Sequence, residues 1–400
     1  MTDRRRFLQW AAAGAAGAGW LAVAPHLALA RAATERRFVF VIQRGAADGL
    51  ETLLPYADPG YARLRGAIAV EAGDNRLDGS FALHPAMNAT AAMYRRNEVL
   101  LLHAVASPYG DRSHFDGQNV LESGGVAPGQ LRDGWLNRLT GLLPEGGREA
   151  IALAPTVPLA LRGARGVTSY SAGGAAGVGD DLLARVGALY HDDPQLHALW
   201  QAALDAREVA QEGSAAAGMG SAARTRGNGA GLGRLAANFL AQPNGPRVAM
   251  IETNGWDTHS AQNARLAARL RELDAMLDAL REGLGTAWAD TVVLVATEFG
   301  RTAAANGTGG TDHGSGAVAM LLGGAVQGGR VLADWPGLAQ ADLLEGRDLR
   351  PTLSLDRVIA AAAGECYGIE PARVRRLLFP RGDALARGGA GMALPRLLRA

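Results

Sequence analysis

The chain has 400 residues, 48% of them hydrophobic, with 40 basic residues against 39 acidic ones. A formal net charge of +1 gives no electrostatic reason to expect nucleic acid or an anionic membrane as a partner. The single cysteine, Cys366, excludes an intrachain disulfide and any metal cluster built from cysteines.

The N-terminus has the features of an export signal. Residues 4–8 (RRRFL) are close to the twin-arginine pattern, and an Ala/Gly-rich stretch at about 10–24 follows. Small residues around Ala30 offer a cleavage site, so we expect residues 1–32 to be a signal peptide for the twin-arginine translocation machinery. A membrane anchor or a buried helix fits less well, because the stretch is short and rich in glycine.

Removal of that segment would change the formal charge from +1 to −2, because it carries four arginines and one aspartate. No other stretch has the apolar length of a transmembrane helix. We therefore expect a periplasmic or secreted protein with no stable membrane anchor and no nucleic-acid partner.

Short β-branched and apolar runs recur along the rest of the chain and are typical of buried strands. Four of them are residues 37–43, 98–103, 248–252 and 291–296. A further run at 150–161 contains Pro155 and Pro158 and should lie at a sheet edge or a bulge.

Helical spacing dominates residues 181–212, 261–284 and 354–363. Residues 213–233 are rich in Gly, Ala and Ser and should form a flexible surface loop. Alternating strands and helices predict an α/β fold of three layers, a doubly wound, mostly parallel sheet with helices on both faces. We expect residues 33–400 to form one such domain.

Polar motifs follow the predicted strands, where an α/β protein places its ligands. These motifs are residues 44–50 (RGAADGL), 107–116 (SPYGDRSHFD), 254–259 (NGWDTH) and 297–302 (TEFGRT), with 309–314 (GGTDHG) shortly after. Carboxylate and imidazole groups are the usual ligands of hard or borderline divalent metals. The sequence therefore predicts a metal-dependent site at one edge of the sheet.

The two early motifs each leave an alternative open. Asp48 could bind a metal at the end of the first strand, or form an Asp-Gly turn or a helix N-cap. Ser113 could be a nucleophile activated by a metal at a helix N-terminus, or an ordinary N-cap. His114 and Asp116 indicate that this loop faces the site, with His114 as a further metal ligand.

In the third motif, an extended backbone would place Asp257 and His259 on one face, where they could share an ion. Thr258 would then point away. Asp257 could instead cap the helix that begins near Ser260.

In the fourth motif, Glu298 could bind a metal or act as a general base, and Arg301 could clamp an anionic oxygen. A structural ion pair between the two is the alternative. Asp312 and His313 in the last motif are the strongest single signal for metal binding or catalysis, because a solvated turn would do equally well with Asn or Ser.

These residues carry two resemblances. The run 38–65, the LHP segment at 83–85, the SHFDGQ loop and the GWDTH, EFGRT and TDHGSG motifs resemble the exported bacterial family catalogued as domain of unknown function 1501. More distantly, the layout is similar to the alkaline phosphatase and sulfatase superfamily. The residues that match the superfamily order are Asp48, Ser113, Asp257, His259, Asp312 and His313.

The second resemblance implies an alkaline-phosphatase-like fold and hydrolysis of a phosphate or sulfate ester with one or two divalent ions, such as Zn, Mn, Mg or Ca. Two features depart from it: the gap between Asp257 and His259 is shorter, and no histidine follows His313. His114 or Glu298 would have to replace the missing ligand, or one metal binds.

The sequence thus predicts an exported, metal-dependent hydrolase of a small-molecule or polymer ester. Ser113, Glu298 and Arg301 would be catalytic. The metal ligands would be Asp48, His114, Asp257, His259, Asp312 and His313. The alternative is a non-catalytic binding or assembly protein of the cell envelope that keeps the fold. An oxidoreductase is a third possibility, which no dinucleotide fingerprint, haem motif or cysteine cluster supports.

Overall fold

A computed structural model describes residues 35–143, 150–170, 229–382 and 393–399. The predicted signal peptide and the helical stretch at 181–212 lie outside the described residues, as does most of the predicted loop at 213–233. Within the described part, no helix is long and apolar enough to cross a membrane.

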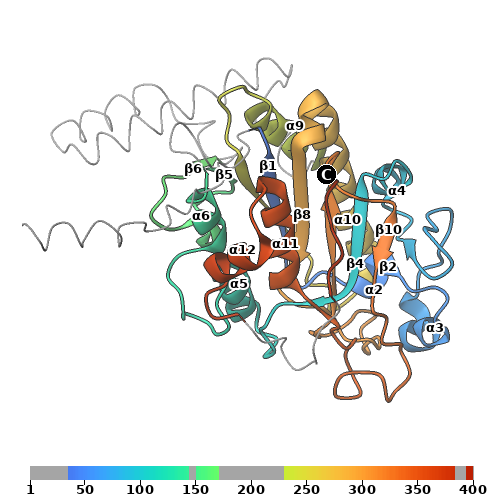
Figure 1. The fold of residues 1–400 in the computed structure, drawn as a ribbon. Coiled ribbons are helices and arrows are strands. Elements are labelled where there is room, and N and C mark those ends of the chain that lie inside the picture. Colours follow the sequence, from blue (N-terminus) through green and yellow to red (C-terminus); the bar gives the residue numbers. More distant parts are fainter. Residues whose placement is uncertain (1–34, 144–149, 171–228, 383–392, 400) are drawn as a thin grey trace, which may run out of the picture.

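A mostly parallel sheet forms the centre of the described structure (Figure 1). Its strands run in the order β10 (Arg330–Leu332), β4 (Val99–Ala106), β9 (Ala317–Leu322), β8 (Thr291–Thr297), β1 (Arg37–Arg44), β7 (Val248–Asn254), β5 (Ala150–Leu153) and β6 (Thr168–Tyr170). The short β11 (Leu353–Ser354) also pairs with β4, and β2 (Leu53–Leu54) forms a separate hairpin with β3 (Ala82–Leu83). Only β9 is antiparallel to its neighbours in the described sheet. The α/β fold class predicted from the sequence is confirmed.

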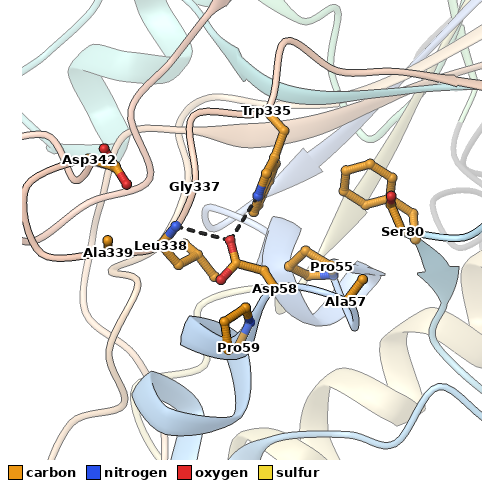
Figure 2. Close-up of a pocket in the computed structure, with 11 residues that line it drawn as sticks. Pro55, Ala57, Asp58, Pro59, Ser80, Trp335, Gly337, Leu338, Ala339 and Asp342 are labelled. Carbon is orange, nitrogen blue, oxygen red and sulfur yellow. Dashed lines mark hydrogen bonds between the residues drawn. The ribbon is translucent and has the colours of Figure 1, made fainter.

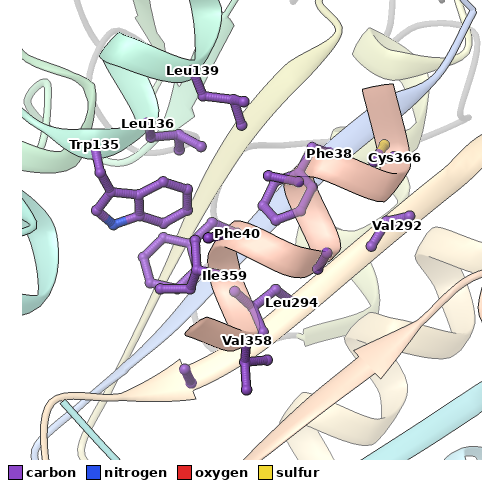
Figure 3. Close-up of a cluster of buried hydrophobic side chains, with 14 of the residues drawn as sticks. Phe38, Phe40, Trp135, Leu136, Leu139, Val292, Leu294, Val358, Ile359 and Cys366 are labelled. Carbon is purple, nitrogen blue, oxygen red and sulfur yellow. The ribbon is translucent and has the colours of Figure 1, made fainter. Parts of the chain in front are cut away.

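Side chains of the buried strands alternate between the two faces of the sheet, so both faces are apolar and helices cover both. On one face, Phe38 and Phe40 of β1 pack with residues of four helices (Figure 3). These are α5 (His114–Ser123), α6 (Trp135–Thr140), α11 (Leu355–Tyr367) and α12 (Pro371–Leu378). On the other face, Val39 and Val41 pack with α4 (Asn88–Arg95), α9 (Gly229–Leu240) and α10 (Gln262–Leu284). Two short helices, α2 (Gly49–Thr52) and α3 (Pro59–Arg65), follow β1.

Aromatic rings fix the first of these faces. The ring of Trp135 lies 5.1 Å from that of Phe40 and 6.2 Å from that of Phe38, edge to face in both pairs. Figure 3 shows Val358 and Ile359 of α11 closing the same cluster. This packing holds β1 at the middle of the sheet, so the loop after β1 has a fixed position.

Two local predictions are wrong. The run at 150–161 forms β5 only as far as Leu153, and β5 has β7 and β6 as neighbours instead of lying at an edge. Its prolines come after the strand, so they remove no hydrogen bond from the sheet.

Residues 229–233, predicted as loop, form the first turns of α9. A Cβ at Gly229 or Gly233 would lie about 2 Å from a backbone oxygen of α10, so these glycines allow two helices to pack closely instead of giving the chain flexibility.

Candidate metal centre

The loops after β1, β7 and β8 meet at one edge of the sheet, because these three strands are parallel neighbours. Gly45 lets two of the loops touch. Its φ is +118°, and a Cβ at this position would lie 2.6 Å from the backbone nitrogen of Asp257. A larger residue would push the loop that carries Asp257 away from the end of β1.

Asp257 lies among three histidines. Its Oδ1 atom is 3.1 Å from Nε2 of His259 and 3.4 Å from Nε2 of His313, and its Oδ2 atom is 3.5 Å from Nε2 of His114. Ligand atoms of His114, Asp257 and His313 all lie within 4.8 Å of one another. We call Asp257 and the three histidines the His–Asp cluster.

The other ring nitrogen of each histidine bonds to an acceptor outside the cluster. The distances from Nδ1 to the acceptor oxygen are 2.8 Å for His114 with Glu298, 2.8 Å for His313 with the carbonyl of Arg112, and 3.1 Å for His259 with Asp312. A carbonyl or an ionised carboxylate can only accept, so each Nδ1 atom carries the proton. In the neutral rings, all three Nε2 atoms therefore direct lone pairs into the cluster.

These lone pairs lack a protein donor. Nε2 of His259 and Nε2 of His313 are 3.0 Å apart, and with both rings protonated at Nδ1 neither can donate to the other. Nε2 of His114 is buried without a hydrogen-bond partner. Converging imidazole and carboxylate donors, each oriented by a second group, are the arrangement that proteins use to hold a divalent metal ion.

The surrounding charges act differently on the individual rings. The hydrogen bond to Glu298 raises the pKa of the His114 imidazole, although burial opposes this, so this ring takes up a proton more readily than a free histidine. Burial acts to raise the pKa of Glu298, but hydrogen bonds, chiefly from His114, lower that pKa overall. Burial also acts to raise the pKa of Asp257, and the hydrogen bond and charge of Arg301 outweigh it, so this pKa too is lowered. Both carboxylates stay ionised at neutral pH. Burial lowers the pKa of the His313 imidazole, which keeps that ring neutral and able to bind a metal.

Glu298 and Arg301 are buried, and their contacts fix the cluster. Besides His114, Glu298 accepts a hydrogen bond from the backbone nitrogen of Gly45 at 2.8 Å. Arg301 donates to four backbone carbonyls and to the carboxylate of Asp257. The alternative of an ion pair between Glu298 and Arg301 is replaced by the pairs Glu298–His114 and Arg301–Asp257.

Two positioning residues escaped the sequence analysis. Arg112 has a φ of +61°, and in this conformation its carbonyl accepts from His313. The buried carboxylate of Asp348 binds the Arg112 guanidinium at 3.0 and 2.7 Å and also accepts from Ser315 Oγ at 2.8 Å. Arg112 lies within a predicted motif, but nothing in the sequence singles out Asp348, which reaches the site only through the fold.

Asp48, predicted as a metal ligand, lies outside the His–Asp cluster, and this prediction needs correction. It is the N-cap of α2, and its side chain is 1% exposed. Arg65 binds both of its oxygens, at 2.5 and 3.1 Å, and Gln262 and Thr311 donate to Oδ2. A metal ion would have to displace these donors. The N-cap alternative describes Asp48.

The structure also gives the positions of the remaining residues considered from the sequence. Asp312 is 54% exposed and bonds to Nδ1 of His259, so it lies on the far side of that ring from the Nε2 atom. Ser113 is the N-cap residue of α5, but its side chain makes no capping hydrogen bond. Thr258 points away, as expected, and its hydroxyl donates to Gln262. The alternative of Asp257 as a helix cap fails, because the N-cap of α10 is Ala261.

Comparison with known families shows the family to which the chain belongs. The model of the family described as "Protein of unknown function (DUF1501)" matches residues 35–378. The chain belongs to this family. A comparison with curated proteins found no match.

The chain is also similar to solved structures. The C-terminal periplasmic domain of EcEptC from Escherichia coli, in complex with Zn, gives a TM-score of 0.41 at 10% identity and covers 91% of this chain and 92% of that chain. A putative sulfatase from Bacteroides thetaiotaomicron gives 0.37 at 10% identity, with 87% and 75% covered. Phosphonoacetate hydrolase from Sinorhizobium meliloti gives 0.30 at 15% identity, with 67% and 57% covered. Similarity with TM-scores below 0.5 supports no inference about chemistry, so the chemistry is inferred from the geometry of the His–Asp cluster.

Proposed function

We propose that this protein is an exported hydrolase of phosphate or sulfate esters that uses one divalent metal ion. The observation that carries the proposal is the convergence of three Nε2 lone pairs on the carboxylate of Asp257, with each Nδ1 proton already engaged. With neutral imidazoles, three carboxylates carry negative charge at the cluster: Asp257 pairs with Arg301, Glu298 bonds to His114, and Asp312 bonds to His259. One divalent ion would balance the remaining charge.

His114, Asp257, His259 and His313 would hold the ion, which would supply Lewis-acid polarisation of an ester oxygen. Glu298 keeps His114 oriented and in the Nδ1-protonated form. The cluster is open on one side, since His259 and Asp257 are 44% and 43% exposed, so a substrate can reach it.

Ser113 is the proposed nucleophile. The Ser113 hydroxyl makes no capping hydrogen bond. The residue directly precedes His114 and lies at the N-terminus of the ten-residue helix α5. The partial positive charge of a helix N-terminus stabilises an anionic oxygen, whether on the serine or on the substrate. Arg301 has a different role from the one predicted, since its donors hold the loops and Asp257 in place.

One observation favours the alternative, a non-catalytic envelope protein with a structural ion. Four protein ligands can close a tetrahedral site, whereas catalytic zinc sites usually keep one position open. The arginine predicted to stabilise a transition state is also fully occupied. Metal binding with no turnover would select this alternative.

The test combines elemental analysis of the purified protein with a panel of phosphate and sulfate esters. We expect about one divalent ion per chain, loss of ion and activity in Asp257→Asn, and loss of activity alone in Ser113→Ala. Asp116→Asn, in the first turn of α5 but outside the cluster, is the matched control and should keep both. An unchanged metal content in Asp257→Asn would overturn the metal site.

Export is a separate part of the proposal and rests on the pattern at residues 4–8. We expect a reporter fused after residue 40 to be exported, and replacement of Arg4, Arg5 and Arg6 by lysine to retain it in the cytoplasm. Export of the lysine variant at the original rate would contradict the twin-arginine route.

A further inference from the structure

A cavity of about 320 Å³ lies apart from the His–Asp cluster, and none of the cluster residues lines it. Its walls come from residues 55–59 between β2 and the start of α3, from Ser80 and Phe81 before β3, and from residues 335–342, which follow β10 (Figure 2). This volume is within the range of pockets that bind small molecules.

A rigid aromatic surface forms one wall of the cavity. The indole nitrogen of Trp335 donates to Oδ2 of Asp58 at 2.9 Å, which Figure 2 shows as a dashed line. The Trp335 ring also packs edge to face against Phe81, at 5.4 Å, and against the buried His103, at 4.9 Å. Its orientation is therefore set before any ligand arrives, and binding would cost little side-chain entropy.

The charged side chains that line the cavity are both acidic. Asp58 accepts from the backbone nitrogens of Gly60 and Leu338 as well as from Trp335, and these bonds hold its carboxylate in place. Asp342 also lines the cavity and lies apart from Asp58 (Figure 2). Gly337 makes room for it, since a Cβ there would lie 3.0 Å from Oδ2 of Asp342.

Two arginines bond to the loop at the cavity but do not line it. Arg63 donates to the carbonyl of Leu338, and Arg350 donates to the carbonyls of Asp342 and Leu343. The lining itself therefore combines two carboxylates with indole, phenyl and proline surfaces, and it carries no basic side chain.

We propose that this cavity binds a small organic cation, an ammonium group carried on a short carbon skeleton. The electron-rich face of Trp335 attracts an alkylammonium group, and the carboxylates of Asp58 and Asp342 compensate its charge. An anion would be repelled. A bare divalent ion would lack the six or more oxygen ligands that hard cations need, because prolines and rings occupy the walls.

Residues 335–342, which contribute to the cavity wall, are followed closely in the chain by Arg347 and Asp348, two residues that support the His–Asp cluster. Arg347 donates to the carbonyl of His313, and Asp348 holds Arg112. The proposal nevertheless goes beyond the proposed function and does not depend on it, since cation binding can be measured on the protein without any turnover.

The test is calorimetric titration of the full chain with choline and with 3,3-dimethylbutan-1-ol, its neutral isostere, at constant ionic strength. We expect saturable choline binding at one site and at least about tenfold weaker binding of the alcohol. Asp342→Asn should weaken choline binding by about tenfold or less, and Trp335→Ala by more than Trp335→Phe, which keeps a ring.

Asp334→Asn is the matched control, since this exposed neighbour of Trp335 does not line the cavity. It should leave choline binding unchanged. Equal binding of choline and the alcohol would overturn the proposal, as would choline binding that survives both Asp342→Asn and Trp335→Ala. Tighter binding of acetate than of choline would overturn it as well.

Discussion

Two polar clusters stand near the carboxyl ends of the central strands, and they are built in opposite ways. In the His–Asp cluster, three imidazole nitrogens and a carboxylate converge without protein donors to satisfy them all. In the second, which we call the Asp48 cluster (Asp48, Glu51, Arg65 and Gln262), each oxygen of Asp48 accepts from several donors. The first is partly exposed, and the second is buried.

The difference shows how a ligand site can be told from a structural ion pair. Both clusters contain an aspartate that follows a central strand, and sequence alone gives them similar weight. Unsatisfied acceptors that point at one another need a proton or a metal ion between them, whereas the oxygens of Asp48 already have their donors. The first cluster should therefore affect metal binding, and the second should affect folding.

The largest expected effect is on the Asp48 cluster. Replacement of Asp48 by Ala removes the two closest carboxylate contacts of the buried Arg65 guanidinium and leaves it only Glu51, at 3.8 Å, as an ion-pair partner. This should reduce the free energy of unfolding by about 3–5 kcal/mol. Chemical denaturation measures this. The folded fraction should keep its metal, because Asp48 is not a ligand. Loss of metal at unchanged stability would reverse the roles of the two clusters.

A pH titration should show the second effect. Burial raises the pKa of Glu51 from its ordinary value of 4.5 to about 8, although the charge of Arg65 opposes this. The folded protein then binds a proton that the unfolded chain releases, so the free energy of unfolding should fall as pH rises from about 5 to about 8. The slope for this one group is at most about 1.4 kcal/mol per pH unit.

Denaturation at several pH values checks this expectation. Glu51→Gln, which keeps an uncharged side chain able to bond with Tyr61, should remove that part of the slope. If wild type and Glu51→Gln show the same pH dependence, the buried carboxyl is not the group that titrates.

A smaller effect is expected from Asp348→Asn. The change removes the ion pair between Asp348 and the Arg112 guanidinium, so the backbone carbonyl of Arg112, which accepts from His313, is held less firmly. Changes in such supporting residues typically lower metal affinity by about 10–100-fold, and we expect a loss in that range by calorimetry. Glu345→Gln is the control: its carboxylate also pairs with Arg112, but it is 44% exposed and should contribute little.

The smallest effect should come from Asp312→Asn. Its carboxylate supports His259 from an exposed position, so metal affinity should fall by less than about tenfold. A loss as large as that of Asp257→Asn would make Asp312 a direct ligand, as the sequence predicted.

The sequence predicted the elements whose signals are local. Buried runs identified β1, β4, β7 and β8, and the extended spacing of Asp257 and His259 placed their side chains together. Partners that depend on the fold were not visible. Arg65 neutralises Asp48, and Asp348 reaches Arg112 from 236 residues away. Pairings of this kind decide whether a carboxylate is free to bind a metal, and no spacing in the chain reveals them.

The most direct test of the central claim is an anomalous difference map from crystals grown with zinc. We expect one strong peak at the His–Asp cluster, with Nε2 of His114, His259 and His313 and an oxygen of Asp257 at about 2.0–2.2 Å from it. A peak beside Asp48, or no peak at the three histidines under saturating zinc, would contradict this account.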